Sequence, residues 1–166
     1  MKNKTLIYSV VFFLAIMGLF AWGNAAKGGD TSGSNSQKSA LVAPEVLYDF
    51  GIISMKNGNV TKEFTVTNPT QEDITVKTVF TSCMCTEAFI VESDGSAKGP
   101  FGMPGHGGAV PPANELIKAG ESRSIRVVYD PNAHGPAGVG VIDRFVTLTD
   151  TSGNTVELEI KANVTP

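Results

Sequence analysis

The sequence predicts an all-β protein, an immunoglobulin-like β-sandwich of about seven strands, preceded by an N-terminal transmembrane or signal helix. Three observations predict this fold. Apolar residues recur at every second position, turn-forming residues separate the periodic runs, and one long apolar run lies near the N-terminus. A period of two is typical of half-buried strands. After the N-terminal run, no window has the period of about 3.6 residues that marks an amphipathic helix.

The N-terminal segment, residues 1–25, is expected to be a signal anchor or a signal peptide. Lys2 and Lys4 precede an uncharged run, residues 5–22, whose length lies between that of a secretory signal and that of a spanning helix. We favour an uncleaved anchor, in which residues 5–22 cross the cell membrane once and the lysines keep the N-terminus in the cytoplasm. The C-terminal domain then lies outside. Cleavage after Ala25 would instead produce a secreted or periplasmic protein.

A flexible linker is expected over residues 26–43, because most of it, up to Ser39, is rich in Gly, Ser and Asn and almost free of large apolar side chains. Residues 44–166 form the expected globular domain. They carry nine Lys or Arg against fifteen Asp or Glu, a net charge of −6. This acidic charge argues against nucleic acid as a partner and against adhesion to anionic lipid through a basic patch.

Seven strands are expected within the globular domain. They lie near 45–53, 60–68, 73–82, 86–92, 121–130, 141–149 and 154–164. The second run places Val60, Phe64 and Val66 on one side, with threonines on the other. The last run alternates without a break from Val156 to Val164. The runs near 73–82 and 121–130 repeat the pattern over fewer residues.

Turn signals separate these runs. They are Lys56–Asn59, Asn68–Thr70, Ala119–Gly120, Asp130–Asn132 and Ser152–Asn154. Seven short strands in about 120 residues, with turns at this spacing, are typical of an immunoglobulin-like sandwich. The inter-sheet disulfide of antibody domains is absent, because both cysteines lie in one short segment.

A Gly/Pro-rich insertion, residues 93–114, does not fit a minimal sandwich. It has no periodicity, and loops longer than about 12–15 residues without structure of their own are usually functional or disordered. Two interpretations stay open. The insertion is a mobile surface loop, or it is a functional loop that uses Phe101, Met103 and His106.

Four short motifs carry a resemblance to a known family. They are Tyr48–Ile53, Phe64–Asn68, Ser82–Thr86 and Ala119–Glu121. On these motifs, residues 46–164 resemble the bacterial domain-of-unknown-function family 1573 (DUF1573). The resemblance implies an exported domain of the Hydin-like and pilus-chaperone-like immunoglobulin type, with no assigned reaction. Two features depart from the family pattern: Met84 stands where glycine is usual, and the insertion after Ser93 is longer.

The motif TSCMCT contains the only two cysteines of the chain, Cys83 and Cys85. In an extended strand, residues i and i+2 project from the same face with Cα atoms about 6.6 Å apart. A flat strand does not bring two Cβ atoms to the roughly 3.8 Å that a disulfide needs, and methionine at position 84 resists the tight fold that glycine would allow. We therefore expect no structural disulfide, and we expect Met84 to point away from the thiols into the core.

Two thiolates on one face suit a soft metal ion, copper or zinc. The selected candidate ligands are Cys83, Cys85, His106 and Met103, and His134 is a weaker candidate. Both histidines lie in Gly/Pro-rich loops that could converge on the cysteines at one end of the sandwich. Two alternatives stay open: the cysteines close one end of the core as small buried residues, or they are redox-active or substrate-linking thiols.

The motifs predict that the protein is not an enzyme, because nothing beyond the two histidines hints at a catalytic base or an oxyanion hole. The favoured hypothesis is a membrane-tethered, non-catalytic binding or scaffold module of the bacterial cell envelope, whose partner is an envelope protein or polymer. The alternative is binding of copper or zinc, or a thiol redox function, through the Cys-x-Cys pair. Apart from these two metals, the sequence indicates no cofactor.

Overall fold

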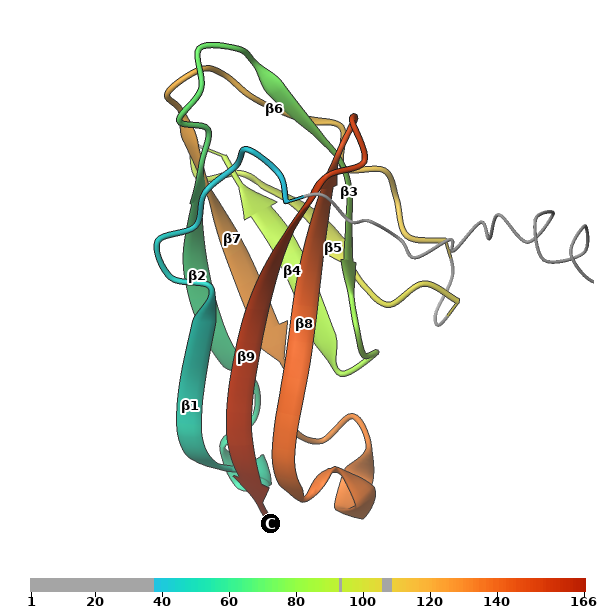
Figure 1. Cartoon of the computed structure of the whole chain (residues 1–166). Helices are drawn as coiled ribbons and strands as arrows, with labels where there is room; N and C mark the ends of the chain where they lie inside the picture. The colour runs from blue at the N-terminus through green and yellow to red at the C-terminus, as the bar shows by residue number, and fades with distance from the viewer. Residues whose placement is uncertain (1–37, 93, 106–108) are drawn as a thin grey trace, which may run out of the picture. The chain divides into compact units, whose positions relative to one another are not determined.

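The computed structural model describes residues 38–92, 94–105 and 109–166 (Figure 1). In this part of the chain the strands form two facing sheets, one in the order β1-β9-β8-β3-β6 and the other in the order β2-β7-β4-β5. The strands are β1 (Leu47–Ser54), β2 (Val60–Thr67), β3 (Ile74–Thr81), β4 (Thr86–Val91), β5 (Ala97–Phe101), β6 (Glu115–Ile117), β7 (Ser122–Tyr129), β8 (Gly140–Asp150) and β9 (Thr155–Thr165). Two short 3-10 helices, η1 (Met55–Asn57) and η2 (Gly135–Gly138), lie in connections.

The all-β sandwich expected from the sequence is confirmed, and each of the seven expected strands is present within a few residues of its expected bounds. The alternating apolar residues of β2, β7 and β9 are buried between the sheets, as the period of two predicts. The core includes Phe64, Ile125, Leu158 and Ile160, each almost completely buried. Among the described strands, every pair is antiparallel except β1 and β9, which run parallel.

The insertion contains structure that its sequence does not reveal. Within residues 93–114, the strand β5 pairs with β4 and places Phe101 opposite Ala88. Phe101 is only 1% exposed, so it belongs to the core. The period-two signal is missing because Gly99 and Pro100 occupy the middle of the strand; a Cβ on Gly99, at φ +139°, would lie 2.9 Å from the carbonyl oxygen of Ala88. The expectation of a segment without strand structure is therefore wrong for residues 97–101.

The expected N-terminal helix, residues 1–25, lies outside the described residues, as does the linker up to residue 37. Within the described ranges, no helix is long and apolar enough to cross a membrane. The remaining linker residues pack on the domain: Leu41 is buried, and Val42 pairs with Thr67 through two backbone hydrogen bonds of 2.8 Å. The ordered domain therefore includes residues 38–43, which the sequence analysis assigns to the linker.

Three connections cross between the sheets at the same end of the sandwich: β1–β2, β3–β4 and β7–β8. The β3–β4 turn leaves the five-stranded sheet for the four-stranded one, and the β7–β8 connection crosses back (Figure 1). The amide of Asp130, just after β7, donates to the carbonyl oxygen of Cys85 at 2.9 Å. The β3–β4 and β7–β8 connections are therefore in contact, and the cysteines lie where they meet.

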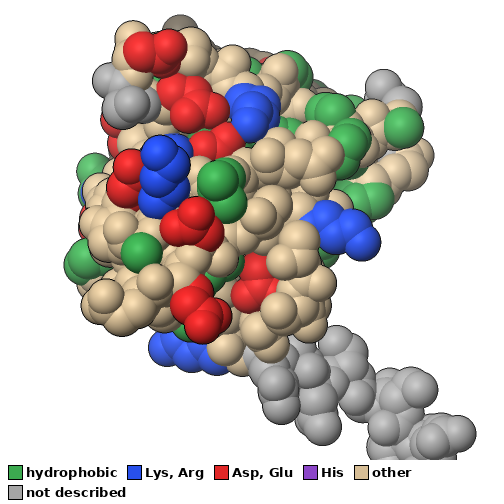
Figure 2. Space-filling view, turned by 90° about the horizontal axis from the view of Figure 1, so that it is seen from above, with side chains coloured by type: hydrophobic (Ala, Val, Ile, Leu, Met, Phe, Trp, Pro, Cys, Tyr) green, Lys and Arg blue, Asp and Glu red, His purple; other side chains and the backbone are tan. Residues whose placement is uncertain are grey.

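The opposite end of the sandwich carries acidic and basic side chains interspersed with one another (Figure 2). Among the described residues, the most buried carboxylate is that of Glu115 on β6. Its oxygens accept from Lys98 Nζ at 2.5 Å and from Arg123 Nε at 2.7 Å. Because β6 belongs to one sheet and Lys98 and Arg123 to the other, these ion pairs join the two sheets at an open edge.

We expect the stability of the domain to fall in acid through Glu115. Burial alone raises the pKa of this carboxyl, but the hydrogen bonds from Lys98 and Arg123 outweigh it and lower the pKa below its usual value. The stabilisation is therefore present above the unfolded pKa, about 4.3, and is lost as the pH falls through the folded pKa. Replacing Glu115 with Gln should lower the unfolding free energy at pH 7 by about 2 kcal/mol.

Urea unfolding of wild type and Glu115→Gln, followed by circular dichroism across the acid range, measures both effects. Glu157→Gln is the matched control, because Glu157 is exposed on β9. An unchanged acid dependence in Glu115→Gln would contradict the assignment.

Candidate functional site

The cysteines lie on a tight turn rather than on a pleated strand. After β3 ends at Thr81, the amide of Thr86 donates to the carbonyl oxygen of Cys83 at 3.1 Å, which closes a β-turn over Cys83–Thr86. The Thr81 hydroxyl supports the turn from inside, because its one proton is shared between the carbonyl oxygens of Cys83 and Thr86, at 3.0 and 2.9 Å. Cys83 and Cys85 therefore lie between two strands, as the expected strand bounds of 73–82 and 86–92 imply, and not in the extended conformation that the same-face argument assumes. The turn still brings the two side chains together.

Met84 occupies an outward-facing position of this turn and is 52% exposed. Its expected place in the core is therefore wrong. The reason is that alternation along a strand, on which the expectation depends, stops at Thr81. A turn residue instead points wherever the turn geometry directs it.

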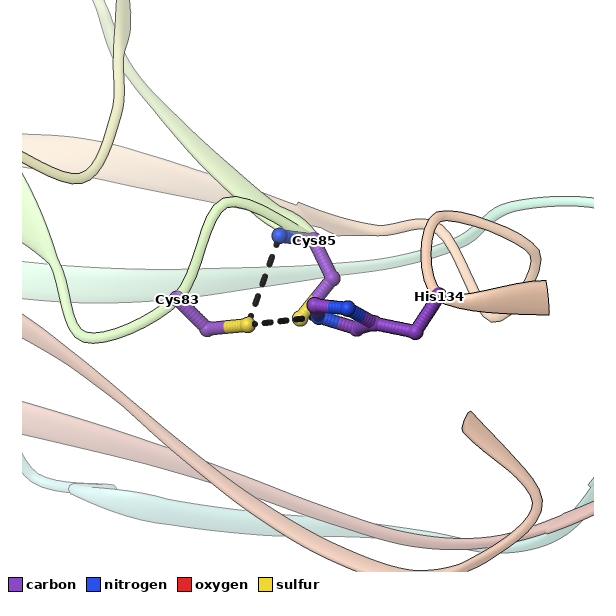
Figure 3. A group of neighbouring side chains, drawn as sticks. All are labelled: Cys83, Cys85 and His134. Carbon is purple, nitrogen blue, oxygen red and sulfur yellow. Dashed lines mark hydrogen bonds between the residues drawn. The ribbon is translucent and has the colours of Figure 1, made fainter. Parts of the chain in front are cut away.

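Cys83, Cys85 and His134 form the candidate site, which we call the thiol–imidazole group (Figure 3). Their ligand atoms all lie within 4.8 Å of one another. The sulfur of Cys83 is 3.2 Å from His134 Nε2 and accepts a hydrogen bond of 3.5 Å from the amide of Cys85. Both cysteines are free thiols; Cys85 is buried, Cys83 is half-buried and His134 is exposed. The group is therefore formed at the surface, with one thiol reaching inward.

His134 is positioned by the β7–β8 connection. Asn132 donates to the Asp130 carboxylate at 2.8 Å through its backbone amide, and to the Met55 carbonyl at 2.9 Å through its side chain. These bonds fix the loop before His134, which occupies the N-cap position of η2 without a side-chain capping bond. A Cβ at Gly138 would lie 3.2 Å from the carbonyl oxygen of Pro131 and 3.4 Å from the Cβ of His134, so the chain returns close to His134 and glycine fits there without any shift of its neighbours.

Arg144, on β8, is a fourth member of the site that the sequence analysis missed. Its Nε donates to the Cys85 sulfur at 3.2 Å, and its Nη1 donates to the Asp143 carbonyl oxygen at 2.8 Å. A signal was present, because Arg144 stands in the same alternating register as buried Ile142 and Val146. A cation at an inward-facing position of a strand needs a partner, and here the partner is a thiol.

The surroundings shift the pKa values of the two thiols in opposite directions. Burial raises the pKa of Cys83, but hydrogen bonds from Cys85 and His134 and the charge of Arg144 outweigh it and lower the pKa to about 7. Burial also raises the pKa of Cys85, and the hydrogen bond with Cys83 adds to this effect, so its pKa stays above the usual value despite Arg144. Cys83 is therefore the more nucleophilic thiol near neutral pH.

We expect iodoacetamide to alkylate Cys83 at a rate that rises to half its maximum near pH 7, because the thiolate is the reacting form. Cys85 should react only at higher pH, since its thiol is buried and its pKa is raised. Mass spectrometry of peptides from the metal-free protein after brief labelling measures both rates. In His134→Ala the half-maximal pH for Cys83 should move upward, and equal labelling of the two cysteines would contradict this assignment.

The structure places the remaining candidate ligands differently from one another. His106 lies outside the described residues. Met103 is half-buried and follows Gly102, whose carbonyl oxygen accepts from the Thr81 amide at 3.1 Å, so this loop passes beside the end of β3. His134, the weaker candidate from sequence, is the histidine that the fold brings to the thiols.

A shallow hollow of about 140 Å³ opens beside Cys85 and is lined in part by Met84 and Asp130. The hollow touches the residue that carries the inner thiol, whereas Cys83 and His134 are not among its lining residues. Two sulfurs and one imidazole nitrogen form a soft donor set that suits Cu(I) or Zn²⁺. A dithiol at this separation is also capable of oxidation, so geometry alone allows both metal binding and thiol redox chemistry.

No family model matches the sequence, and no curated protein matches it. Among solved structures, a protein of unknown function from Porphyromonas gingivalis W83 has a TM-score of 0.53 at 15% identity, covering 77% of this chain and 48% of that chain. PapD-like domain 7 of human CEP192 has a TM-score of 0.47 at 9% identity, with 77% and 87% covered. The periplasmic chaperone SfaE has a TM-score of 0.39 at 9% identity, with 76% and 58% covered.

The likeness to the Porphyromonas gingivalis protein concerns the fold alone, because the identity is low. The chain spans about half the length of the Porphyromonas gingivalis protein.

Proposed function

We propose that the exported domain binds one thiophilic metal ion, Cu(I) or Zn²⁺, through Cys83, Cys85 and His134. The observation that supports this proposal is the convergence of three ligand atoms within 4.8 Å. Ligands around a tetrahedral zinc ion lie about 3.3–3.8 Å apart, given its bond lengths of roughly 2.0–2.3 Å. Small side-chain rotations would contract the group to that size, and the hydrogen-bonded turn and loop would move little.

The alternatives explain less of the geometry. Two buried cysteines that merely close the core would account for Cys85, but not for a half-buried Cys83 in a hydrogen bond with an imidazole. Thiol redox chemistry would use the lowered pKa of Cys83, but it gives no role to His134 at 3.2 Å beyond that effect. Metal binding uses all three side chains at once.

The location of this function is also a proposal. The lysines at positions 2 and 4 and the uncharged run at residues 5–22 support a single-pass anchor with the domain outside the cell membrane. The resemblance to domain-of-unknown-function family 1573 supports export as well. A tethered domain of this kind would capture metal ions at the cell envelope, either directly at the membrane or, if the signal is cleaved, in the space outside it.

Metal titration of the full chain tests the proposal. The reduced protein, held in detergent because of the apolar run, is titrated anaerobically with Cu(I) or Zn²⁺ against a chromophoric chelator. Uptake of one ion per chain, with release of thiol protons and the ultraviolet charge-transfer absorption of a metal–thiolate bond, is the expected result. If the protein takes up neither Cu(I) nor Zn²⁺, the metal-binding proposal is wrong.

A second candidate function is the non-catalytic envelope module. The observation that favours it is a pair of exposed apolar side chains on the outer face of the five-stranded sheet. Ile52 of β1 and Val141 of β8 both lie in register with Asn163 of β9, and they are 76% and 84% exposed. The two side chains lie on either side of Asn163, and an exposed apolar patch on one face of a sheet is typical of a contact surface.

Cross-linking in intact cells separates this candidate from the first. An Ile52→Ser, Val141→Ser double variant should lose its cross-link to an envelope protein or polymer, whereas a variant without the cysteines should keep it. The reverse pattern would favour the thiol–imidazole group as the functional surface.

A further inference from the structure

Arg144 is the feature of the site that metal binding alone does not explain. Its side chain enters between the sheets from β8, and among the described residues its guanidinium hydrogen-bonds to the Cys85 sulfur and to the Asp143 backbone carbonyl. Neither contact is with a carboxylate. Arg144 therefore brings a permanent positive charge to the inner thiol of the metal-binding group.

We propose that the site selects Cu(I) over Zn²⁺, and that Arg144 sets this selectivity through its charge. This inference rests on the proposed function, since it concerns the identity of the ion that the same group binds.

The net charge of the occupied site differs between the two ions. Two thiolates, a neutral imidazole and the Arg144 guanidinium together carry a charge of about −1. Binding of Cu(I) makes the site neutral, whereas binding of Zn²⁺ leaves one positive charge beside the buried Cys85. Uncompensated charge is unfavourable where water is partly excluded, so Arg144 penalises the divalent ion more than the monovalent one.

The number of ligands favours the same ion. In the described part of the chain, the thiol–imidazole group has three donor atoms: two sulfurs and one nitrogen. Structural Zn²⁺ sites almost always have four ligands, whereas Cu(I) is a softer ion that accepts fewer and prefers thiolate sulfur. Arg144 also occupies one side of the Cys85 sulfur at 3.2 Å, where it cannot itself act as a ligand.

Competition titrations of wild type, Arg144→Gln and Arg144→Lys, with Cu(I) and with Zn²⁺ against chelators, test this inference on the full chain. Removal of the charge in Arg144→Gln should raise the affinity for Zn²⁺ relative to that for Cu(I) by about tenfold to a hundredfold. Arg144→Lys keeps the charge and should stay much closer to wild type. Arg126→Gln is the matched control, because Arg126 pairs with Glu63 on the other sheet.

The outcomes are distinguishable. If wild type binds neither ion, the proposed function itself fails. If both ions bind through the cysteines but the ratio in Arg144→Gln equals that of wild type, only the selectivity inference is overturned. Should Arg144→Gln fail to fold, Met84→Lys adds a positive charge at an exposed position beside Cys85 and should shift the ratio further toward Cu(I), whereas an unchanged ratio would overturn the inference.

Discussion

Replacement of both Cys83 and Cys85 with serine is expected to weaken the binding of Cu(I) and Zn²⁺ by at least about a thousandfold. The thiolate is the form that binds metal, and a serine hydroxyl does not ionise near neutral pH. Serine is close to cysteine in size, so the turn closed by the Cys83 carbonyl and the Thr86 amide should persist. Competition titration gives the affinity, and thermal unfolding followed by circular dichroism reports whether the fold is kept.

Two single variants make this result specific. His134→Ala should lower the affinity by at least about tenfold, since even groups that only orient a metal ligand contribute this much. Met103→Leu should change it by less than about threefold, which would leave the selected ligand set as the two cysteines with His134. A loss in Met103→Leu as large as that in His134→Ala would instead make the Met103 thioether a ligand. If the double serine variant keeps its full affinity for the metal ions, the proposed metal site is wrong.

Phe101→Ala is expected to lower the unfolding free energy by about 3–5 kcal/mol. Phe101 is almost fully buried although it lies in the Gly/Pro-rich insertion, and its strand β5 forms the edge of the four-stranded sheet. Truncation to alanine leaves a cavity between the sheets that their rigid packing cannot close. Urea unfolding of the full chain, monitored by circular dichroism, measures the change.

The matched control for this prediction is Met103→Ala in the same insertion. Met103 is half-buried, so its truncation should cost about 1 kcal/mol. A change below about 1 kcal/mol for Phe101→Ala would mean that the insertion is a mobile surface loop after all, the interpretation that the sequence also allowed.

The strands could be predicted because their signal is local. In β9, every second side chain from Val156 to Val164 is buried, and a reader needs only neighbouring residues to see the pattern. The same reasoning found β2 and β7. It failed at β5, where Gly99 and Pro100 interrupt the alternation and where only pairing with β4 makes the segment a strand.

The candidate site was predictable only in part. The two cysteines are neighbours in sequence, so their proximity follows from chain connectivity, whatever the local backbone does. The partners are distant in sequence: His134 is 51 residues from Cys83, and Arg144 is 59 residues from Cys85. Neither separation carries a sequence signal of contact. From sequence alone, His106 therefore ranks before His134, and nothing connects Arg144 to the thiols.

By itself, the sequence determined an all-β sandwich, an acidic domain and a pair of adjacent thiols, because periodicity, composition and chain connectivity are properties of nearby residues. Only the tertiary structure decided which side chains surround those thiols. Two of the connections that cross between the sheets at one end are β3–β4 and β7–β8, and their contact through the Asp130 amide brings His134 and Cys83 together. That contact depends on how both sheets pack around one core, a condition that no local stretch of sequence contains.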